Sequence, residues 1–411
     1  MPVKIAFIAN QFPVLSATFI LNQITGLIDL GHDVRIIAYT DPQEPRVHPD
    51  IEKYNLLART RYIPPTPKHK ALCLMKALWL VISNFHKGPV ELLKFIRMFI
   101  LRRKGLSLSR LYLLLEFIEG DFGIVQCHYG PVGIDGVFLK DAGVKAKICT
   151  AFHGFDMSRY PLTHGRDVYD DLFKKGDLFM PISEYWKKEL IDMGCPPEKT
   201  VVHRMGIDLD RFEYCEKDLD PAQPVGILTI GRLVEKKGHE FAIKAVAKLI
   251  HSGHNIEYVI AGDGPLRESL EALAAHFGIS DRVVFMGPVE RDEVVGLYER
   301  AHLFLLPSVT AADGDKEGIP VVLMEALAVG LPALATDHSG IREIIIDGKT
   351  GFLAPERNSD VLAERLQHLL NHPQQWPAMG RVGRKHVEDN YDIKVLNRKL
   401  ESIFEELSEG H

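Results

Sequence analysis

The stretch GILTIGRLVEKKGHEFAIKAVAKLIH (residues 226–251) decides the fold class of this chain. Apolar and β-branched residues dominate its beginning and predict a short buried strand, Gly226–Ile230. A turn bounded by glycines follows, Gly231–Gly238, and the later apolar residues recur at helical spacing, which predicts a helix over Gly238–His251. A strand that leads through a turn into a helix is the repeating unit of α/β proteins with parallel sheets.

The same alternation continues on both sides of this unit, and 411 residues are too many for one ordinary core. Downstream, the pattern predicts strands at Glu257–Ala261, Val283–Met286, Leu303–Leu306 and Pro332–Ala335, and helices at Pro265–Phe277, Asp292–Arg300 and Ile319–Val329. Upstream, it predicts strands at Val3–Ala9, Val34–Tyr39, Ile124–His128 and Lys147–Phe152, and a helix at Ala17–Leu30. The sequence therefore predicts two consecutive α/β domains.

We place the first domain at residues 1–205, the second at 206–382, and a C-terminal helical segment at 383–411. The hinge is expected in the segment that begins at Val201 and continues through a charged, proline-containing stretch to Pro224. Residues Ile393–Leu407 predict the last helix.

Composition excludes several classes of protein. A net charge of −6 and a pI of about 6.3 argue against a nucleic-acid binder. The five cysteines are scattered and form no C-x-x-C pair, which argues against a disulfide framework and a zinc site. The N-terminus opens directly into a strand, and no apolar run is long enough to span a bilayer, so a cytoplasmic protein is expected.

Residues 68–110 depart from this acidic balance. Ten of them are Lys or Arg and one, Glu91, is acidic, with apolar and aromatic residues interleaved. Such basic amphipathic helices suit the surface of an anionic bilayer, which would place the protein peripherally on the cytoplasmic face of the inner membrane. The alternative is a pair of ordinary helices that cover the first domain and turn a basic face to solvent.

Two glycine turns in the second domain fit phosphate binding. In Gly231–Gly238, Arg232 and Lys237 stand five residues apart and can grip a diphosphate from two sides, close to the start of a helix. Gly262-Asp263-Gly264 forms the next strand-to-helix turn. Open α/β sheets bind ligands at the carboxyl ends of their strands, which favours this interpretation over an exposed basic loop and a plain turn.

Two glutamates, Glu317 and Glu325, stand eight positions apart around the start of a predicted helix. Eight helical residues rise about 12 Å, a separation at which two carboxylates could accept hydrogen bonds from hydroxyls at both ends of a nucleotide sugar. Glu317 alone would mean little, because anions at helix starts are common. Glu325 lies in an otherwise apolar helix, where an unpaired carboxylate is costly.

Two histidines end neighbouring strands of the first domain. His153 follows the strand that begins at Lys147 and precedes a glycine, and His128 ends the preceding predicted strand. Both imidazoles are therefore expected at one edge of the sheet, where they could reach a cleft. The alternative is a pair of hydrogen-bonded core histidines.

In order and spacing, these motifs resemble glycosyltransferase family 4, the retaining enzymes with the GT-B fold. The resemblance implies two Rossmann-like domains that face each other across a cleft, the first for the acceptor and the second for the donor, with the last helix crossing back to the first. Residues 12–20 and 309–318 are similar to the exopolysaccharide enzymes of colanic-acid and amylovoran type.

The resemblance also implies roles for individual residues. The catalytic set would be His153, Glu317, Arg232 and Lys237, with Arg232 and Lys237 on the donor diphosphate, Glu317 on the transferred sugar and His153 over that sugar. The donor site would comprise Gly231, Arg232, Lys237, Gly262, Asp263, Gly264, Met286, Glu317, Gly318, Ile319 and Glu325, with Met286 near the base, Gly318 and Ile319 near the phosphates and Glu325 on the ribose. The acceptor side would comprise Ser16, Thr18, His128, His153 and Asp156.

The chain departs from the family pattern in its first loop. Leu15–Thr18 replaces the Gly-Gly pair of many members, and Ala17 stands where the exopolysaccharide subgroup usually has Glu. These departures concern the contacts with the acceptor and leave the donor site intact.

The resemblance implies transfer of a hexose from a nucleotide-diphosphate sugar, with a UDP-sugar favoured over a GDP-sugar, to a glycan or polyprenyl-diphosphate-linked acceptor. No cofactor and no metal are expected: Asp313-Gly314-Asp315 has the D-x-D form of metal-dependent enzymes, but the cationic loop already supplies positive charge. A 2-epimerase of the same fold and a catalytically silent sugar-nucleotide-binding subunit are the alternatives. A nicotinamide dehydrogenase is disfavoured, because no G-x-G-x-x-G follows the first strand.

Overall fold

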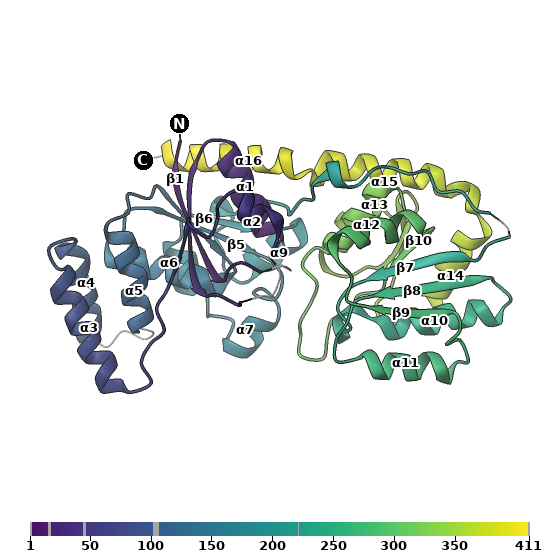
Figure 1. Cartoon of the computed structure of the whole chain (residues 1–411), viewed down its shortest axis with the longest axis horizontal. Helices are drawn as coiled ribbons and strands as arrows, with labels where there is room; N and C mark the ends of the chain where they lie inside the picture. The colour runs from purple at the N-terminus through teal and green to yellow at the C-terminus, as the bar shows by residue number, and fades with distance from the viewer. Residues whose placement is uncertain (1, 15–17, 44–46, 102–106, 221, 410–411) are drawn as a thin grey trace.

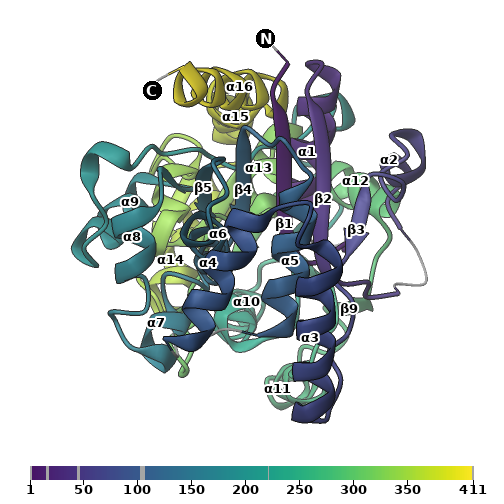
Figure 2. The same ribbon diagram turned by 90° about the vertical axis from the view of Figure 1, so that its left-hand side faces the viewer.

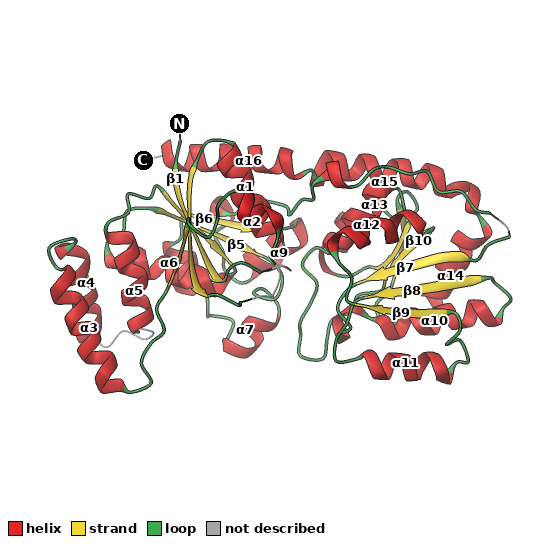
Figure 3. Ribbon diagram, viewed as in Figure 1, coloured by secondary structure: helices red, strands yellow, loops and turns green. Residues whose placement is uncertain are grey.

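The computed structural model describes residues 2–14, 18–43, 47–101, 107–220 and 222–409. Its first parallel sheet consists of β1 (Lys4–Gln11), β2 (Asp33–Thr40), β3 (Thr60–Tyr62), β4 (Ile124–His128), β5 (Lys147–Phe152) and β6 (Leu178–Pro181). Its second consists of β7 (Val225–Ile230), β8 (Ile256–Ala261), β9 (Val283–Gly287), β10 (Leu303–Leu306), β11 (Ala333–Thr336) and β12 (Gly351–Ala354). The two sheets lie side by side along the molecule (Figure 3).

Both sheets have the same topology. Their strand orders are β3-β2-β1-β4-β5-β6 and β12-β11-β10-β7-β8-β9. When the second sheet is numbered from its own first strand, β7, and read from the opposite edge, its order is the same as that of the first sheet. This is the strand order of the Rossmann fold, in which the direction of winding reverses beside the first strand. The predicted α/β architecture with two Rossmann-like domains is therefore confirmed.

Helices cover both faces of each sheet (Figure 1). Those before the hinge are α1 (Thr18–Asp29), α2 (Pro49–Lys53), α3 (Lys70–Asn84), α4 (Pro89–Ile100), α5 (Leu108–Ile118), α6 (Gly130–Ala142), α7 (Arg159–His164), α8 (Asp170–Lys175) and α9 (Glu184–Asp192). Those after it are α10 (His239–His251), α11 (Arg267–His276), α12 (Arg291–Arg300), α13 (Val321–Val329), α14 (Ser359–Asn371), α15 (Trp376–Tyr391) and α16 (Ile393–Glu409). Short 3-10 turns are at Pro197–Lys199, Leu209–Arg211, Glu235–Lys237, Ser339–Glu343 and Pro373–Gln375.

The predicted strands match the observed ones to within two residues at their ends, whereas β3, β6 and β12 were not predicted. These three strands are only three or four residues long. The helix predicted at Ile319–Val329 begins two residues later, with Pro320 as its extended N-cap. Glu317 therefore lies in the loop ahead of the helix.

The chain returns to its first domain at the end. Two segments connect the domains, one near Ile207 and one near Ile393, and they are hydrogen-bonded to each other. Ile207 N–H donates to Tyr391 O at 2.9 Å, and Ile393 N–H donates to Ile207 O at 3.0 Å. Helix α16 then packs on α1, where Leu400 and Phe404 are fully buried. The first strand and the last helix consequently belong to the same domain (Figure 1).

Helices α3 and α4 lie on the outer end of the first domain, away from the second (Figures 1 and 2). One face of the pair is buried against the domain through Leu80, Leu92 and Phe95. A second apolar face remains exposed. No helix in the described part of the chain is long and apolar enough to cross a bilayer.

Candidate donor site between the two domains

Two glycine turns of the second domain pack backbone against backbone. The N–H of Gly231, at the end of β7, donates to Ala261 O at 3.0 Å. A Cβ on Gly262, whose φ is +140°, would lie 2.0 Å from Gly231 O, and one on Gly264 would lie 2.6 Å from Leu233 O. Side chains larger than hydrogen do not fit at these two positions, so the turns after β7 and β8 can pack this closely only with glycine.

A buried ion pair occupies the centre of the site. The Lys237 ammonium lies 2.9 Å from the Glu317 carboxylate, and both side chains are almost fully buried. Burial of Glu317 favours the neutral acid, but Lys237 and then Lys236 outweigh it and hold the pKa of Glu317 below its ordinary value. Glu317 therefore stays a carboxylate at neutral pH, able to accept hydrogen bonds from hydroxyl groups.

The D-x-D segment of the preceding loop faces cations of the protein. Asp315 lies 3.1 Å from the Lys236 ammonium, and Asp313 lies 3.1 Å from the Arg159 guanidinium. Among the described residues, no cluster of three or more acidic, histidine or cysteine side chains has an arrangement suited to a metal ion. The absence of a metal requirement stays a prediction.

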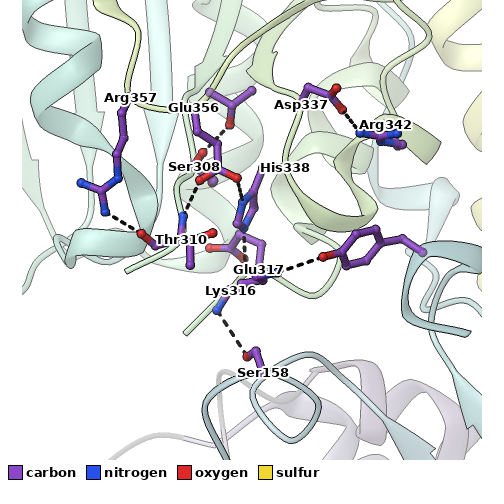
Figure 4. A network of polar contacts seen from close by, with 12 residues as sticks. Ser158, Ser308, Thr310, Lys316, Glu317, Asp337, His338, Arg342, Glu356 and Arg357 are labelled. Carbon is purple, nitrogen blue, oxygen red and sulfur yellow. Dashed lines mark hydrogen bonds and ion pairs between the residues drawn. The ribbon is translucent and has the colours of Figure 1, made fainter. Parts of the chain in front are cut away.

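The loop from Thr310 to Glu317 is held by two residues that were not predicted from the sequence, His338 and Glu356 (Figure 4). The carboxylate of Glu356 accepts from Thr310 N–H at 2.7 Å and lies 2.7 Å from Nδ1 of His338. Nε2 of the same imidazole accepts from Glu317 N–H at 3.0 Å. Both ends of the loop are thereby tied to the second sheet.

The first domain contributes a pair of stacked histidines. Nδ1 of His128 lies 3.0 Å from Nε2 of His153, so the two imidazoles meet at one sheet edge as predicted. Burial lowers the pKa of His128 to about 3 and also lowers the pKa of His153, so both rings are neutral at pH 7. One ring then donates to the other, which couples their tautomers.

Asp156 lies behind this pair and shapes the turn. Its carboxylate is fully buried and accepts backbone N–H groups of Gly130, His153 and Gly154, each at 2.9 Å. Asp156 was predicted on the acceptor side, but a carboxylate with no exposed surface cannot touch an acceptor in this conformation. Burial raises its pKa to about 6, an effect that the three backbone donors reduce.

The two domains meet at the motifs that the sequence predicted for the site. A Cβ on Gly318 would lie 1.9 Å from the carbonyl oxygen of His153, and one on Gly154 would lie 2.8 Å from the Cα of Gly318. The indole N–H of Trp186 donates to Gly318 O at 3.2 Å, and the ammonium of Lys316 lies 3.0 Å from the hydroxyl of Tyr185. His153 and Glu317 are thus brought together from opposite domains.

The remaining predicted residues lie around this centre. Glu325 is half-buried on α13 and accepts from the Tyr298 hydroxyl at 2.8 Å, so its expected cost of burial is offset by a hydrogen bond. Arg232 is exposed in the loop that follows β7, and Met286 is exposed at the end of β9. Thr18 begins α1 beside Phe19, whose ring lies 4.7 Å from that of His153. Ser16 lies outside the described residues.

A cavity of about 350 Å³ lies between the two domains. It is lined mainly by apolar side chains of the first domain, including Met157, Leu162 and Trp186, and by Thr310 and Lys316 of the second. None of the predicted donor-site residues lines it.

Two Rossmann-like domains, with a cation–carboxylate site and two histidines where they meet, define a glycosyltransferase of the GT-B fold. Comparison with known proteins agrees. Residues 16–211 match the family described as Glycosyltransferase Family 4, and residues 210–386 match the family described as Glycosyl transferases group 1.

Similar proteins extend over the whole chain. The putative colanic acid biosynthesis glycosyltransferase WcaL of Escherichia coli is 39% identical, covering 98% of this chain and all of that protein. The amylovoran biosynthesis glycosyltransferase AmsK of Erwinia amylovora is 38% identical with the same coverage. The structure of Anabaena Alr3699/HepE in complex with UDP-glucose, 15% identical, superposes with a TM-score of 0.74 over 98% of this chain and 100% of that one. The chain belongs to glycosyltransferase family 4.

Proposed function

We propose that the chain is a retaining hexosyltransferase that takes a hexose from a nucleotide-diphosphate sugar, UDP-linked in preference to GDP-linked, and adds it to a lipid-linked exopolysaccharide intermediate. The observation that carries this proposal is the Lys237–Glu317 pair placed against His153 at the domain interface. The names of the E. coli and Erwinia relatives support exopolysaccharide synthesis, and the UDP-glucose in the Anabaena structure supports the class of donor.

In the proposed reaction, the bond between the anomeric carbon and the diphosphate breaks as the acceptor oxygen forms its bond on the same face. The acceptor proton passes to an oxygen of the departing diphosphate. Negative charge therefore grows on the leaving group, where Lys237 and the exposed Arg232 supply cations. Glu317 accepts hydrogen bonds from the transferred sugar and orients its reacting carbon.

The donor site is tested by measuring hydrolysis of UDP-, GDP- and ADP-hexoses by the full chain without acceptor. We expect release of free sugar and nucleoside diphosphate from a UDP-hexose, and NMR during transfer to show the anomeric configuration of the donor. Isomerised donor in place of free sugar would identify a 2-epimerase. No turnover of any donor, together with unchanged polymer synthesis in cells carrying Glu317→Ala, would identify a silent binding subunit.

We further propose that helices α3 and α4 hold the enzyme on an anionic membrane that carries the acceptor. Their exposed apolar face includes Trp79, Ile82 and Ile100, which are 62%, 66% and 72% exposed. Lys76 and Lys94 belong to the same two helices, and the basic segment has an excess of nine positive charges. Large exposed apolar side chains in a segment of net positive charge match the interface of a bilayer rich in anionic lipid.

Sedimentation with vesicles of phosphatidylglycerol and phosphatidylcholine tests this proposal. Replacing Trp79 and Ile82 by Ser should reduce the bound fraction without unfolding the protein, because both side chains are largely exposed. Val382→Ser, an exposed apolar position on α15, serves as the matched control. Unchanged binding of the double variant would refute the proposal. The charge reversals Arg102→Glu and Arg103→Glu test the same segment at positions that lie outside the described residues.

A further inference from the structure

The loop that carries Glu317 depends on a hydrogen-bonded chain that starts two strands away. Glu356 follows β12 and His338 follows β11, so both lie at the carboxyl ends of neighbouring parallel strands. The imidazole of His338 is fully buried, and the Glu356 carboxylate is largely buried. Figure 4 shows the chain running from Glu356 through His338 to the backbone of Glu317.

One protonation pattern satisfies every contact in this chain. The N–H of Glu317 is a donor, so Nε2 of His338 must be the acceptor and the proton of the neutral ring must lie on Nδ1. That proton points at one oxygen of Glu356, while the other oxygen accepts from Thr310 N–H. Burial favours the neutral acid, but the hydrogen bonds from His338 and Thr310 hold the pKa of Glu356 below its ordinary value. This series of hydrogen bonds therefore requires Glu356 to be a carboxylate, with two acceptor oxygens.

We propose that Glu356 is a positioning residue: through the tautomer of His338 it fixes the backbone at Glu317, and with it the carboxylate that meets the transferred sugar. The inference rests on the proposed function, because it gives Glu317 that role. The same carboxylate fixes Thr310, so both ends of the loop take their position from one side chain.

Glu356→Gln is the discriminating variant, because it has the same size and removes one acceptor. Its amide has one acceptor oxygen and one NH2 group, which only donates, so either Thr310 N–H or Nδ1–H of His338 loses its acceptor. If His338 switches tautomer to accept from the amide, its Nε2–H faces the N–H of Glu317. We expect kcat for hydrolysis of the donor to fall about 10- to 100-fold, while the Kd of UDP measured by calorimetry stays unchanged.

Asp337→Asn is the matched control. It makes the same change of carboxylate to amide one residue from His338, in an exposed pair with Arg342 at 2.8 Å that does not touch the loop. Its kcat should equal that of the wild type. An unchanged Kd for UDP in Glu356→Gln also establishes that the second domain of the variant is folded.

A double-mutant cycle with Glu317→Gln separates positioning from loop stability. If Glu356 acts through the Glu317 carboxylate, adding Glu356→Gln to Glu317→Gln should change the residual kcat less than twofold. A full additional loss, a wild-type kcat in Glu356→Gln alone, or a loss of UDP binding in that variant would each overturn the inference. Failure of the wild type to hydrolyse any nucleotide sugar would instead overturn the proposed function.

Discussion

The contact between Gly318 and His153 makes a sharp prediction for Gly318→Ala. The added Cβ would lie 1.9 Å from the carbonyl oxygen of His153, whereas ordinary contacts of a Cβ begin at 3.4 Å. The neighbouring atom is backbone of the opposite domain, so no side-chain rotation can relieve the overlap. The two domains must separate locally by about 1.5 Å, and a misplacement of about 1 Å can cost about 100-fold in rate.

We therefore expect kcat of Gly318→Ala to fall about 100-fold, with a much smaller change in the Kd of UDP, because the glycine turns that we propose to bind the diphosphate belong to the second domain alone. Initial rates of donor hydrolysis and transfer give kcat, and calorimetry gives the Kd. The thermal unfolding temperature should change little, since the backbone of Gly318 has an ordinary conformation that alanine can adopt.

Gly226→Ala provides the control. Its Cβ would meet its nearest atom at 3.4 Å, at the start of β7 and away from the domain interface. A Gly318→Ala enzyme with kcat within twofold of the wild type would show that the observed closure is not required for the reaction.

Three further predictions concern single residues. Lys237→Gln leaves the buried Glu317 carboxylate without its nearest cation, so the pKa of Glu317 should rise. The free energy of unfolding at pH 7, measured by urea denaturation, should fall by about 3 kcal/mol. Glu325→Gln should raise the KM of the donor about tenfold with little change in kcat, if its carboxylate holds the ribose; steady-state kinetics decide this. Burial lowers the pKa of His128 to about 3, whereas the pKa of a histidine in an unfolded chain is about 6.5. Between these two pH values the unfolded state binds more protons than the folded state. The free energy of unfolding therefore falls as the pH falls from about 6.5 towards about 3. The slope for this group is about 1.4 kcal/mol per pH unit, and His128→Gln should flatten the decline in urea midpoint between pH 6.5 and 4.5; an unchanged slope would contradict the buried neutral ring.

The sequence predicted the features that depend on local backbone geometry. The turns at Gly231 and Gly262 and the histidine at the end of β5 follow from a strand, a glycine and a helix in succession. In a parallel sheet, such turns gather at one edge, so their proximity follows from topology. The approach of Gly318 to His153 depends on how the two domains pack against each other, and only the family resemblance indicated it.

The residues that hold the loop of Glu317 in place, His338 and Glu356, could not be predicted from local backbone geometry. His338 and Glu356 are 21 and 39 residues from Glu317 and have no motif spacing, because their contacts depend on which strands become neighbours. Asp156 was misplaced for a related reason: its spacing from His153 was visible, but the direction of its side chain into the turn was not. His338 and Glu356 each lie two residues after a strand, but the strand before Glu356, β12, was itself not predicted.

The paired segments at Ile207 and Ile393 have a consequence for how the protein is made. They bring the two connections between the domains together, so that the second domain is inserted into the first between α9 and α16. Leu400 and Phe404, which complete the core around α1, are therefore synthesised after the entire second domain. During translation from the N-terminus, the second domain can fold first, and the first domain closes its core only when the last helix has left the ribosome.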